Sequence, residues 1–274
     1  MPPRVVAIIQ ARMASSRLPG KVLLDISGQA MLARVVARAS RSARLDQILV
    51  ATTTDASDDA VDSYCASRGI LCARGSQYDV LDRYYQAALQ YRPDLVVRVT
   101  GDCPAIDPHL IDDAVATLAS DNAGPFDFVA NRLPPPFHRT FPIGLDVEVC
   151  TFSALERAWQ EGYEPQHREH VMPYLYEGVQ LSPRSLQLAA GASSRGFRIA
   201  LLNHVPDLGA YRWTVDTPED LEFMRQVFAR FGGRDDFSWT DMLQLVEREP
   251  QLTLINAGVQ HKTLRDHDER ALKH

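Results

Sequence analysis

The sequence predicts an α/β protein in which a mostly parallel sheet lies between two layers of helices. Residues 4–11 form an apolar run rich in β-branched residues, which is typical of a strand buried on both faces. Strand and helix patterns then alternate to about residue 120 with short connections between them. This order favours a parallel sheet covered by helices on both sides. With no internal repeat and no long linker, we expect one domain over residues 1–274.

The first half of the chain supplies most of the predicted sheet. Residues 30–43 place apolar side chains at helical spacing, with Arg34, Arg38 and Arg41 on the other face of the helix. The remaining elements of this half, in order, are a strand at 47–53, a helix at 58–69 that ends at Gly69, a strand at 70–75, a helix at 80–91, a strand at 94–102 and a helix at 107–120.

The second half is less regular, and strands are predicted at 126–132 and 144–152. Four prolines exclude a strand in the LPPPFHRTFP segment between them. Residues 154–162 and 168–178 have helical patterns, the second interrupted near Pro173. We interpret residues 131–180 as an inserted arm.

The last predicted elements are a strand at 211–215 and a strong helix that runs to residue 232. Asp216 or Thr217 caps this helix, and Pro218 lies in its first turn. Residues 256–274 are expected to form a charged tail.

Composition narrows the classes of function. A net charge of −6 argues against a nucleic-acid binder that relies on bulk charge. The four cysteines form no CxxC pair, so free thiols in a reducing cytoplasm are expected. No apolar run approaches the roughly 20 residues that span a bilayer. We therefore expect a cytoplasmic protein that binds neither nucleic acid nor membrane.

A basic loop follows the first predicted strand in this acidic chain. The stretch QARMASSRLPGK contains Arg12, Arg17 and Lys21, together with Ser15 and Ser16. It matches neither the Walker A pattern nor the GxGxxG fingerprint. Side-chain cations and loop N–H groups could hold a small anion such as a polyphosphate. The alternative is a solvated basic turn.

Two aspartates are expected on the other side of the same cleft. Asp102 follows the strand at 94–100 and Asp216 follows the strand at 211–215. Ligands bind outside the carboxyl ends of the strands in open α/β sheets, so these side chains should meet the basic loop. Mg²⁺ takes one or two carboxylates together with phosphate oxygens. The alternatives are ordinary roles in a turn or a helix cap.

Further candidates lie in the second half. Asp146 and Glu148 are two residues apart, hence on one face of a predicted strand, which suggests a second metal-linked site, hydrogen bonds to a sugar, or simply a polar strand face. The HREH stretch lacks zinc-motif spacing. Its Arg168 and His170 are instead candidates for contact with an acidic substrate.

Six stretches in order resemble the SpsF-type cytidylyltransferases, a family named from spore-coat polysaccharide synthesis and similar to CMP-sialic acid and CMP-Kdo synthetases. The resemblance covers about residues 4–230, and Ala14 departs from it where the family usually has Gly. The stretches are IIQARMASSRLPGKVLLDISGQAMLARVV, RGSQYDVLDRYYQAA, VVRVTGDCPAIDP, GLDVEV, REHVMPYL and RWTVDTPEDLEF.

The resemblance implies a nucleotide-diphospho-sugar transferase fold, which is GT-A-like and Rossmann-like. It implies a CTP-dependent reaction in which an acceptor oxygen attacks the α-phosphate and pyrophosphate leaves. It also implies a homodimer formed through the arm at 131–180.

The resemblance implies roles for individual residues as well. Arg12, Lys21 and Asp102 would be catalytic, and Asp102 with Asp216 would hold the cofactor Mg²⁺. The nucleotide site would comprise Gln10, Ala11, Arg12, Ser15, Ser16, Arg17, Lys21, Asp79, Arg83 and Asp102. The acidic, sugar-like acceptor would meet Asp146, Glu148, Arg168 and His170.

Two other functions compete with this one. A glycosyltransferase that consumes a nucleotide-sugar usually carries Asp-x-Asp after a central strand, whereas TGDCP has a single Asp. An inactive nucleotide-binding homologue would have no need to keep Arg12, Lys21, Asp102 and Asp216 together.

Overall fold

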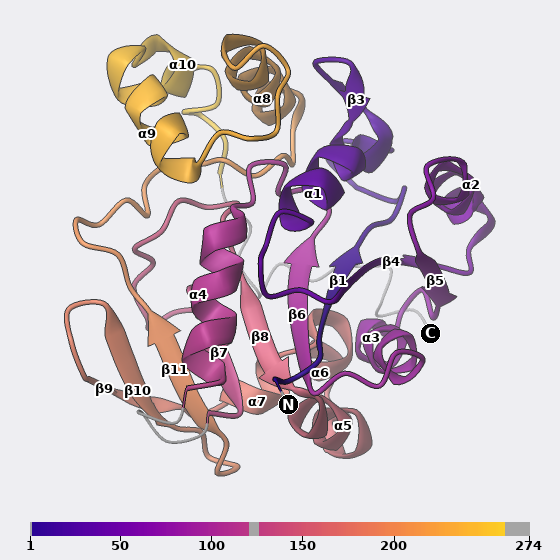
Figure 1. The fold of residues 1–274 in the computed structure, drawn as a ribbon, viewed down its shortest axis with the longest axis vertical. Helices are drawn as coiled ribbons and strands as arrows, with labels where there is room; N and C mark the ends of the chain where they lie inside the picture. The colour runs from indigo at the N-terminus through magenta and orange to yellow at the C-terminus, as the bar shows by residue number, and fades with distance from the viewer. Residues whose placement is uncertain (1, 121–125, 261–274) are drawn as a thin grey trace.

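Nine strands form one sheet in the order β5-β4-β1-β6-β8-β7-β11-β10-β9 in the computed structural model, which describes residues 2–120 and 126–260 (Figure 1). The strands are β1 (Val5–Gln10), β4 (Gln47–Thr53), β5 (Cys72–Gly75), β6 (Leu95–Thr100), β7 (Phe128–Ala130), β8 (Glu148–Thr151), β9 (Gln180–Pro183), β10 (Leu188–Ala192) and β11 (Arg198–Leu202). A separate hairpin pairs β2 (Asp25–Ile26) with β3 (Gln29–Ala30).

Helices separate most of the strands along the chain. They are η1 (Lys21–Leu23), α1 (Met31–Ala39), η2 (Ala56–Asp58), α2 (Asp59–Ser67), α3 (Val80–Leu89), α4 (Pro108–Leu118), α5 (Phe152–Glu161), α6 (Pro165–His170), α7 (Pro173–Tyr176), α8 (Pro218–Arg230), α9 (Trp239–Arg248) and α10 (Gln251–Leu254). The capping box at Thr217 and Asp220 starts α8, and Pro218 occupies its first turn as predicted.

The first half of the sheet is parallel. Strands β5, β4, β1 and β6 run in the same direction, and β8 inserts antiparallel between β6 and β7. The edge is completed by β11, which is parallel to β7, and by the antiparallel strands β10 and β9. The expected mostly parallel sheet is thus confirmed.

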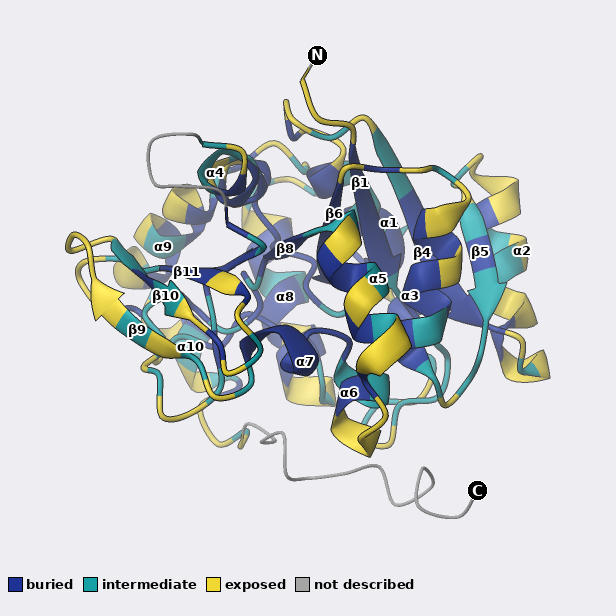
Figure 2. Ribbon diagram, turned by 90° about the horizontal axis from the view of Figure 1, so that it is seen from below, coloured by how far each residue is buried: buried dark blue, intermediate teal, exposed yellow. Residues whose placement is uncertain are grey.

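Alternate side chains of β1 enter two different cores, which makes the fold three-layered. Ala7 and Ile9 belong to a core shared with α1, α2 and α4, whereas Val6 and Ile8 pack with α3, α5 and α7. Figure 2 shows that β1, β4 and β6 are almost entirely buried between these layers. Burial on both faces explains why the first strand is a continuous apolar run.

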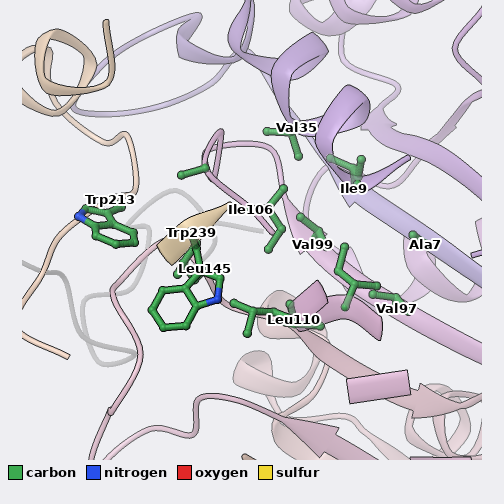
Figure 3. Close-up of a cluster of buried hydrophobic side chains, with 14 of the residues drawn as sticks. Ala7, Ile9, Val35, Val97, Val99, Ile106, Leu110, Leu145, Trp213 and Trp239 are labelled. Atoms are coloured by element: carbon green, nitrogen blue, oxygen red, sulfur yellow. The ribbon is translucent and has the colours of Figure 1, made fainter. Parts of the chain in front are cut away.

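The carboxyl-terminal helices extend the first of these cores beyond the sheet. Figure 1 shows α8, α9 and α10 grouped past the carboxyl ends of β1 and β6. Figure 3 shows Trp213 and Trp239, which belong to the same core as Leu145 and Ile106. These helices therefore fix the segment that precedes α8 against the end of the sheet.

The prediction that Arg34 and Arg38 lie on the face of α1 opposite its apolar side chains needs correction, because both arginine side chains are fully buried. Arg34 donates to the carbonyls of Ile26, Ser27 and Gly233 and to the carboxylate of Asp235. The Arg38 guanidinium donates to backbone carbonyls of the 105–106 turn and of Asp235, and it lies 4.1 Å from the Phe237 ring centroid. Burial lowers the pKa of Arg38 to about 10, which leaves it charged at neutral pH.

We expect Arg38→Met to destabilise the protein by about 2–4 kcal/mol, because it leaves buried carbonyl groups without donors. Equilibrium unfolding in urea measures the effect. Arg41→Met is the matched control, since Arg41 lies just after α1 and is exposed. Equal stability of the two variants would contradict the anchoring role of Arg38.

Other predictions about the second half need correction. Residues 131–180 do not stand apart as an arm, because they supply the interior strand β8 and the helices α5 to α7. Dimerisation through this segment stays a prediction. The expected strand at 211–215 forms a single bridge, between Ile143 and Arg212. Within the expected tail, Asn256 is buried, and residues 261–274 lie outside the described range.

Candidate active site

The basic loop leaves the carboxyl end of β1 and folds back on itself. The carbonyl oxygen of Met13 accepts hydrogen bonds from the backbone N–H groups of Ser15 and Gly20, at 3.0 and 2.8 Å. The N–H of Met13 donates to the buried carboxylate of Asp58 at 2.6 Å. Gly20 has a φ of 70°, a left-handed conformation that glycine adopts without strain. This turn delivers Lys21 into the interior.

Lys21 is the centre of the site, and only 8% of the residue is exposed. Its ammonium donates to Asp102 Oδ2 at 2.7 Å, to Asp216 Oδ1 at 2.9 Å and to the carbonyl oxygen of Val215 at 2.8 Å. Burial acts to lower the pKa of Lys21, but the two carboxylates raise it above its ordinary value. The ammonium charge is therefore permanent at neutral pH.

Asp216 is surrounded by cations. Its Oδ2 accepts from Arg17 at 2.8 Å and from Arg212 at 2.9 Å, while Oδ1 faces Lys21. Burial acts to raise the pKa of Asp216, yet these cations lower it to about 2. The carboxylate is thus ionised throughout the physiological range, and it holds the basic loop against the start of α8.

Asp102 is the more open of the two carboxylates. Its Oδ2 accepts from Lys21, whereas the only described contact of Oδ1 is the Cys103 thiol at 3.7 Å. Gly101 brings this turn close to β1, since its N–H donates to the Gln10 carbonyl at 2.8 Å and a Cβ there would lie 2.9 Å from the same oxygen. The ends of β1 and β6 are therefore held together.

The Lys21 ammonium marks a point where two carboxylates converge on one cation. Residues 2–120 and 126–260 contain no cluster of three or more His, Cys, Asp or Glu side chains suited to a metal. Mg²⁺ needs only one or two carboxylates when phosphate oxygens and water complete its shell. Asp102 and Asp216 fit that requirement, with Asp102 offering the less occupied oxygen.

The loop that precedes α3 brings three other predicted residues together. Asp79 caps α3 by accepting from Asp82 N–H at 2.8 Å, and it forms an ion pair with Arg168 of α6. Arg83 is 3% exposed and donates to the Ser76 carbonyl. Burial lowers the pKa of Arg83, and neighbouring Arg12 lowers it further. Arg12 is therefore near enough to Arg83 for the two positive charges to repel each other.

The predicted acceptor residues lie on different elements, with Glu148 on β8 and with Arg168 and His170 on α6. Strand β8 begins only at Glu148, so Asp146 precedes it and the two carboxylates do not share a strand face. Asp146 pairs with Arg139 and lies close enough to Cys103 to raise the pKa of that thiol. Glu148 is 5% exposed and pairs with Arg98, and its contact with an acceptor stays a prediction.

Three remaining candidates are placed by local structure. His170 ends α6 and precedes Val171, whose φ is 70°. Ser15 Oγ accepts from the Leu18 N–H at 3.4 Å, and Ser16 is exposed. Ion pairs join Arg17, Lys21, Asp102 and Asp216 into one cluster, which we call the cradle.

Comparison with known proteins gives the family of the chain. A family model described as cytidylyltransferase matches residues 6–236. The chain belongs to the cytidylyltransferase family. That match includes every residue of the cradle, so the resemblance expected from the sequence is confirmed at the family level.

This cytidylyltransferase is 30% identical to the spore coat polysaccharide biosynthesis protein SpsF of Bacillus subtilis, over 90% of this chain and 95% of SpsF. It is 31% identical to a 3-deoxy-manno-octulosonate cytidylyltransferase of a Bradyrhizobium strain, over 83% and 98% of the two chains. A solved cytidylyltransferase from Leptospira borgpetersenii superposes with a TM-score of 0.81 at 32% identity, covering 94% of this chain and 100% of that one.

Sequence reasoning missed two partners of the cradle in this cytidylyltransferase. Arg212 clamps Asp216 and Asp220, and the four-residue spacing in RWTVDTPED was the available signal. The carbonyl of Val215, which accepts from Lys21, carried no signal because any residue presents a backbone carbonyl.

None of the helices formed by residues 2–120 and 126–260 combines the length and apolar character needed to cross a membrane.

Proposed function

We propose that the protein transfers CMP from CTP to an acidic sugar or sugar-like acceptor and releases pyrophosphate, with Mg²⁺ as cofactor. The observation that carries this proposal is Lys21, held between Asp102 and Asp216 at the carboxyl ends of β1 and β6. Cations for a triphosphate and carboxylates for a divalent metal thus occupy one place. The activity named for the Bradyrhizobium relative supports CTP and a sugar acid as substrates.

The cradle would act mainly through charge. Arg12, Arg17 and Lys21 would bind the triphosphate, and Lys21 would stabilise the charge that develops on the leaving pyrophosphate. Asp102 and Asp216 would hold Mg²⁺, which polarises a phosphoryl oxygen when bound. The acceptor oxygen forms a bond to the α-phosphorus as the bond to pyrophosphate breaks, and the hydroxyl proton is released. No covalent enzyme intermediate is needed.

The acceptor would bind on the β8 side of the cradle. Asp146 lies on this side, near Cys103 and therefore near Asp102. Arg168 and His170 of α6 are the proposed contacts for an acidic group, with Arg168 shared between the acceptor and Asp79. The relationship to SpsF supports a role in supplying polysaccharide precursors. A cytoplasmic homodimer is part of the same proposal.

Pyrophosphate release tests the proposed function. We expect the purified protein to release pyrophosphate from CTP when Mg²⁺ and a suitable sugar acid are both present. EDTA should abolish the release, and excess Mg²⁺ should restore it. A panel of sugar acids, with neutral sugars as the control, identifies the acceptor. Consumption of a nucleotide-sugar without any turnover of CTP would instead support a glycosyltransferase.

A further inference from the structure

A buried ion pair lies beside the end of β1 and takes no part in the cradle. Arg98 of β6 and Glu148 of β8 occupy paired positions in the sheet, and their side chains are 15% and 7% exposed. Arg98 Nη1 donates to Glu148 Oε2. Pairing with Glu148 raises the pKa of Arg98 in spite of burial, so the guanidinium stays charged. Such a pair is costly to bury and weak evidence of stability by itself.

The rest of the guanidinium holds Gln10, the last residue of β1. Arg98 Nε and Nη2 donate to the same oxygen, Gln10 Oε1, at 3.2 and 3.0 Å. Because a guanidinium has no acceptor, this contact places the amide oxygen inward and the amide NH₂ outward. Gln10 Nε2 makes no hydrogen bond to the described residues, and it is not among the fully enclosed polar atoms. It is a donor directed away from Arg98.

A fixed amide behaves differently from a free one. A free glutamine side chain can turn its amide by half a rotation and present either a donor or an acceptor. At Gln10 that rotation would place NH₂ against the Arg98 N–H groups and break both hydrogen bonds. Arg98 and Glu148 therefore restrict Gln10 to the role of donor.

The position of Gln10 indicates which ligand it meets. Its side chain lies on the face of β1 that carries Ile8, which α3 covers. Lys21, by contrast, turns toward Asp102 and the 212–216 segment beside the other core. A nucleotide whose phosphates lie in the cradle can extend across the end of β1 and place its base near Gln10.

We propose that Gln10 recognises the cytosine base of the nucleotide and that Arg98 is the residue that positions it. The ring N3 of cytosine carries no hydrogen and is an acceptor, which matches the fixed NH₂. The N3 of uracil carries a hydrogen, so it opposes a donor and would require the amide to turn. Selection of CTP over UTP then follows from an unpaired donor at the wrong base. This inference rests on the proposed function.

Equilibrium binding of CTP and UTP in the presence of Mg²⁺, without acceptor, tests the proposal. We expect the wild type to prefer CTP. Gln10→Glu presents an oxygen acceptor in place of NH₂, so the ratio of CTP affinity to UTP affinity should fall by about tenfold or more. Arg98→Lys keeps a cation beside Glu148 but loses the two hydrogen bonds from the guanidinium to Gln10 Oε1. The ratio of CTP affinity to UTP affinity should therefore fall while much of the CTP affinity remains.

Gln47→Glu is the matched control, because Gln47 lies at the opposite end of the neighbouring strand β4. It should bind both nucleotides as the wild type does. A merely structural role for Gln10 and Arg98 would weaken CTP and UTP equally, and an unchanged affinity ratio in both variants overturns this inference. Failure of the wild type to bind CTP at all would overturn the proposed function instead.

Discussion

Replacing Asp102 by Asn is expected to lower the rate of pyrophosphate release by at least about 100-fold while leaving the fold intact. The amide has the same shape and can still accept from Lys21, and the backbone carbonyl of Asp102 still accepts from Val215 N–H and Thr214 Oγ1. What is lost is the negative charge of the less occupied proposed metal ligand. A coupled pyrophosphate assay at saturating CTP measures the effect, with circular dichroism to verify folding.

Glu222→Gln is the control for this change, because Glu222 is an exposed carboxylate on α8, outside the cradle. It should retain wild-type activity. If Asp102→Asn also retained full activity at ordinary Mg²⁺ concentrations, the cradle could not be the catalytic site.

Replacing Lys21 by Met is expected to reduce both activity and stability. Activity should fall by roughly 100-fold or more through loss of the charge that stabilises the leaving pyrophosphate. The free energy of unfolding should fall by about 3 kcal/mol, because Lys21 is the described ion-pair partner of Asp102 and its loss leaves that carboxylate without a compensating charge. Asp216 would keep Arg17 and Arg212. Urea unfolding at neutral pH and the pyrophosphate assay measure the two effects.

The double variant Lys21→Met with Asp102→Asn separates charge from packing. It should be more stable than Lys21→Met alone, since the uncompensated carboxylate is gone, yet it should stay inactive. If the double variant were no more stable than the single one, the cost of removing Lys21 would lie in packing, and our electrostatic account would be wrong.

The parallel half of the fold and the cradle could be predicted because both depend on local patterns. Continuous apolar runs mark the strands buried on both faces, and the ends of parallel strands meet at one edge. Lys21 and Asp102 follow such runs, and the topology of the sheet brings the ends of those strands together. Asp216 follows a segment that joins the structure through a single bridge, between Ile143 and Arg212, so its position depends on packing as well as on sheet topology.

What could not be predicted depends on partners distant in the sequence. Strands β9 and β10 contain Pro183 and Gly191, residues that weaken a strand pattern, and they are held by pairing in the sheet. Arg34 has the local pattern of a surface residue, but its partners Gly233 and Asp235 lie about 200 residues away. Glu148 likewise has the alternating pattern of a residue on an exposed strand face. Its partner Arg98 lies 50 positions away in the sequence, so the local pattern does not indicate the buried ion pair.

The span between Lys21 and Asp216 also bears on how the protein is made. The two residues are 195 positions apart in the sequence, and Arg34 is 199 positions from its partner Gly233. During synthesis the first strands and the basic loop emerge from the ribosome long before the segment with Asp216, whose carboxylate pairs with Arg17 and Lys21. A nascent chain therefore carries an incomplete cradle until the segment around Asp216 has emerged, and competence to bind nucleotide should arise late and in one step.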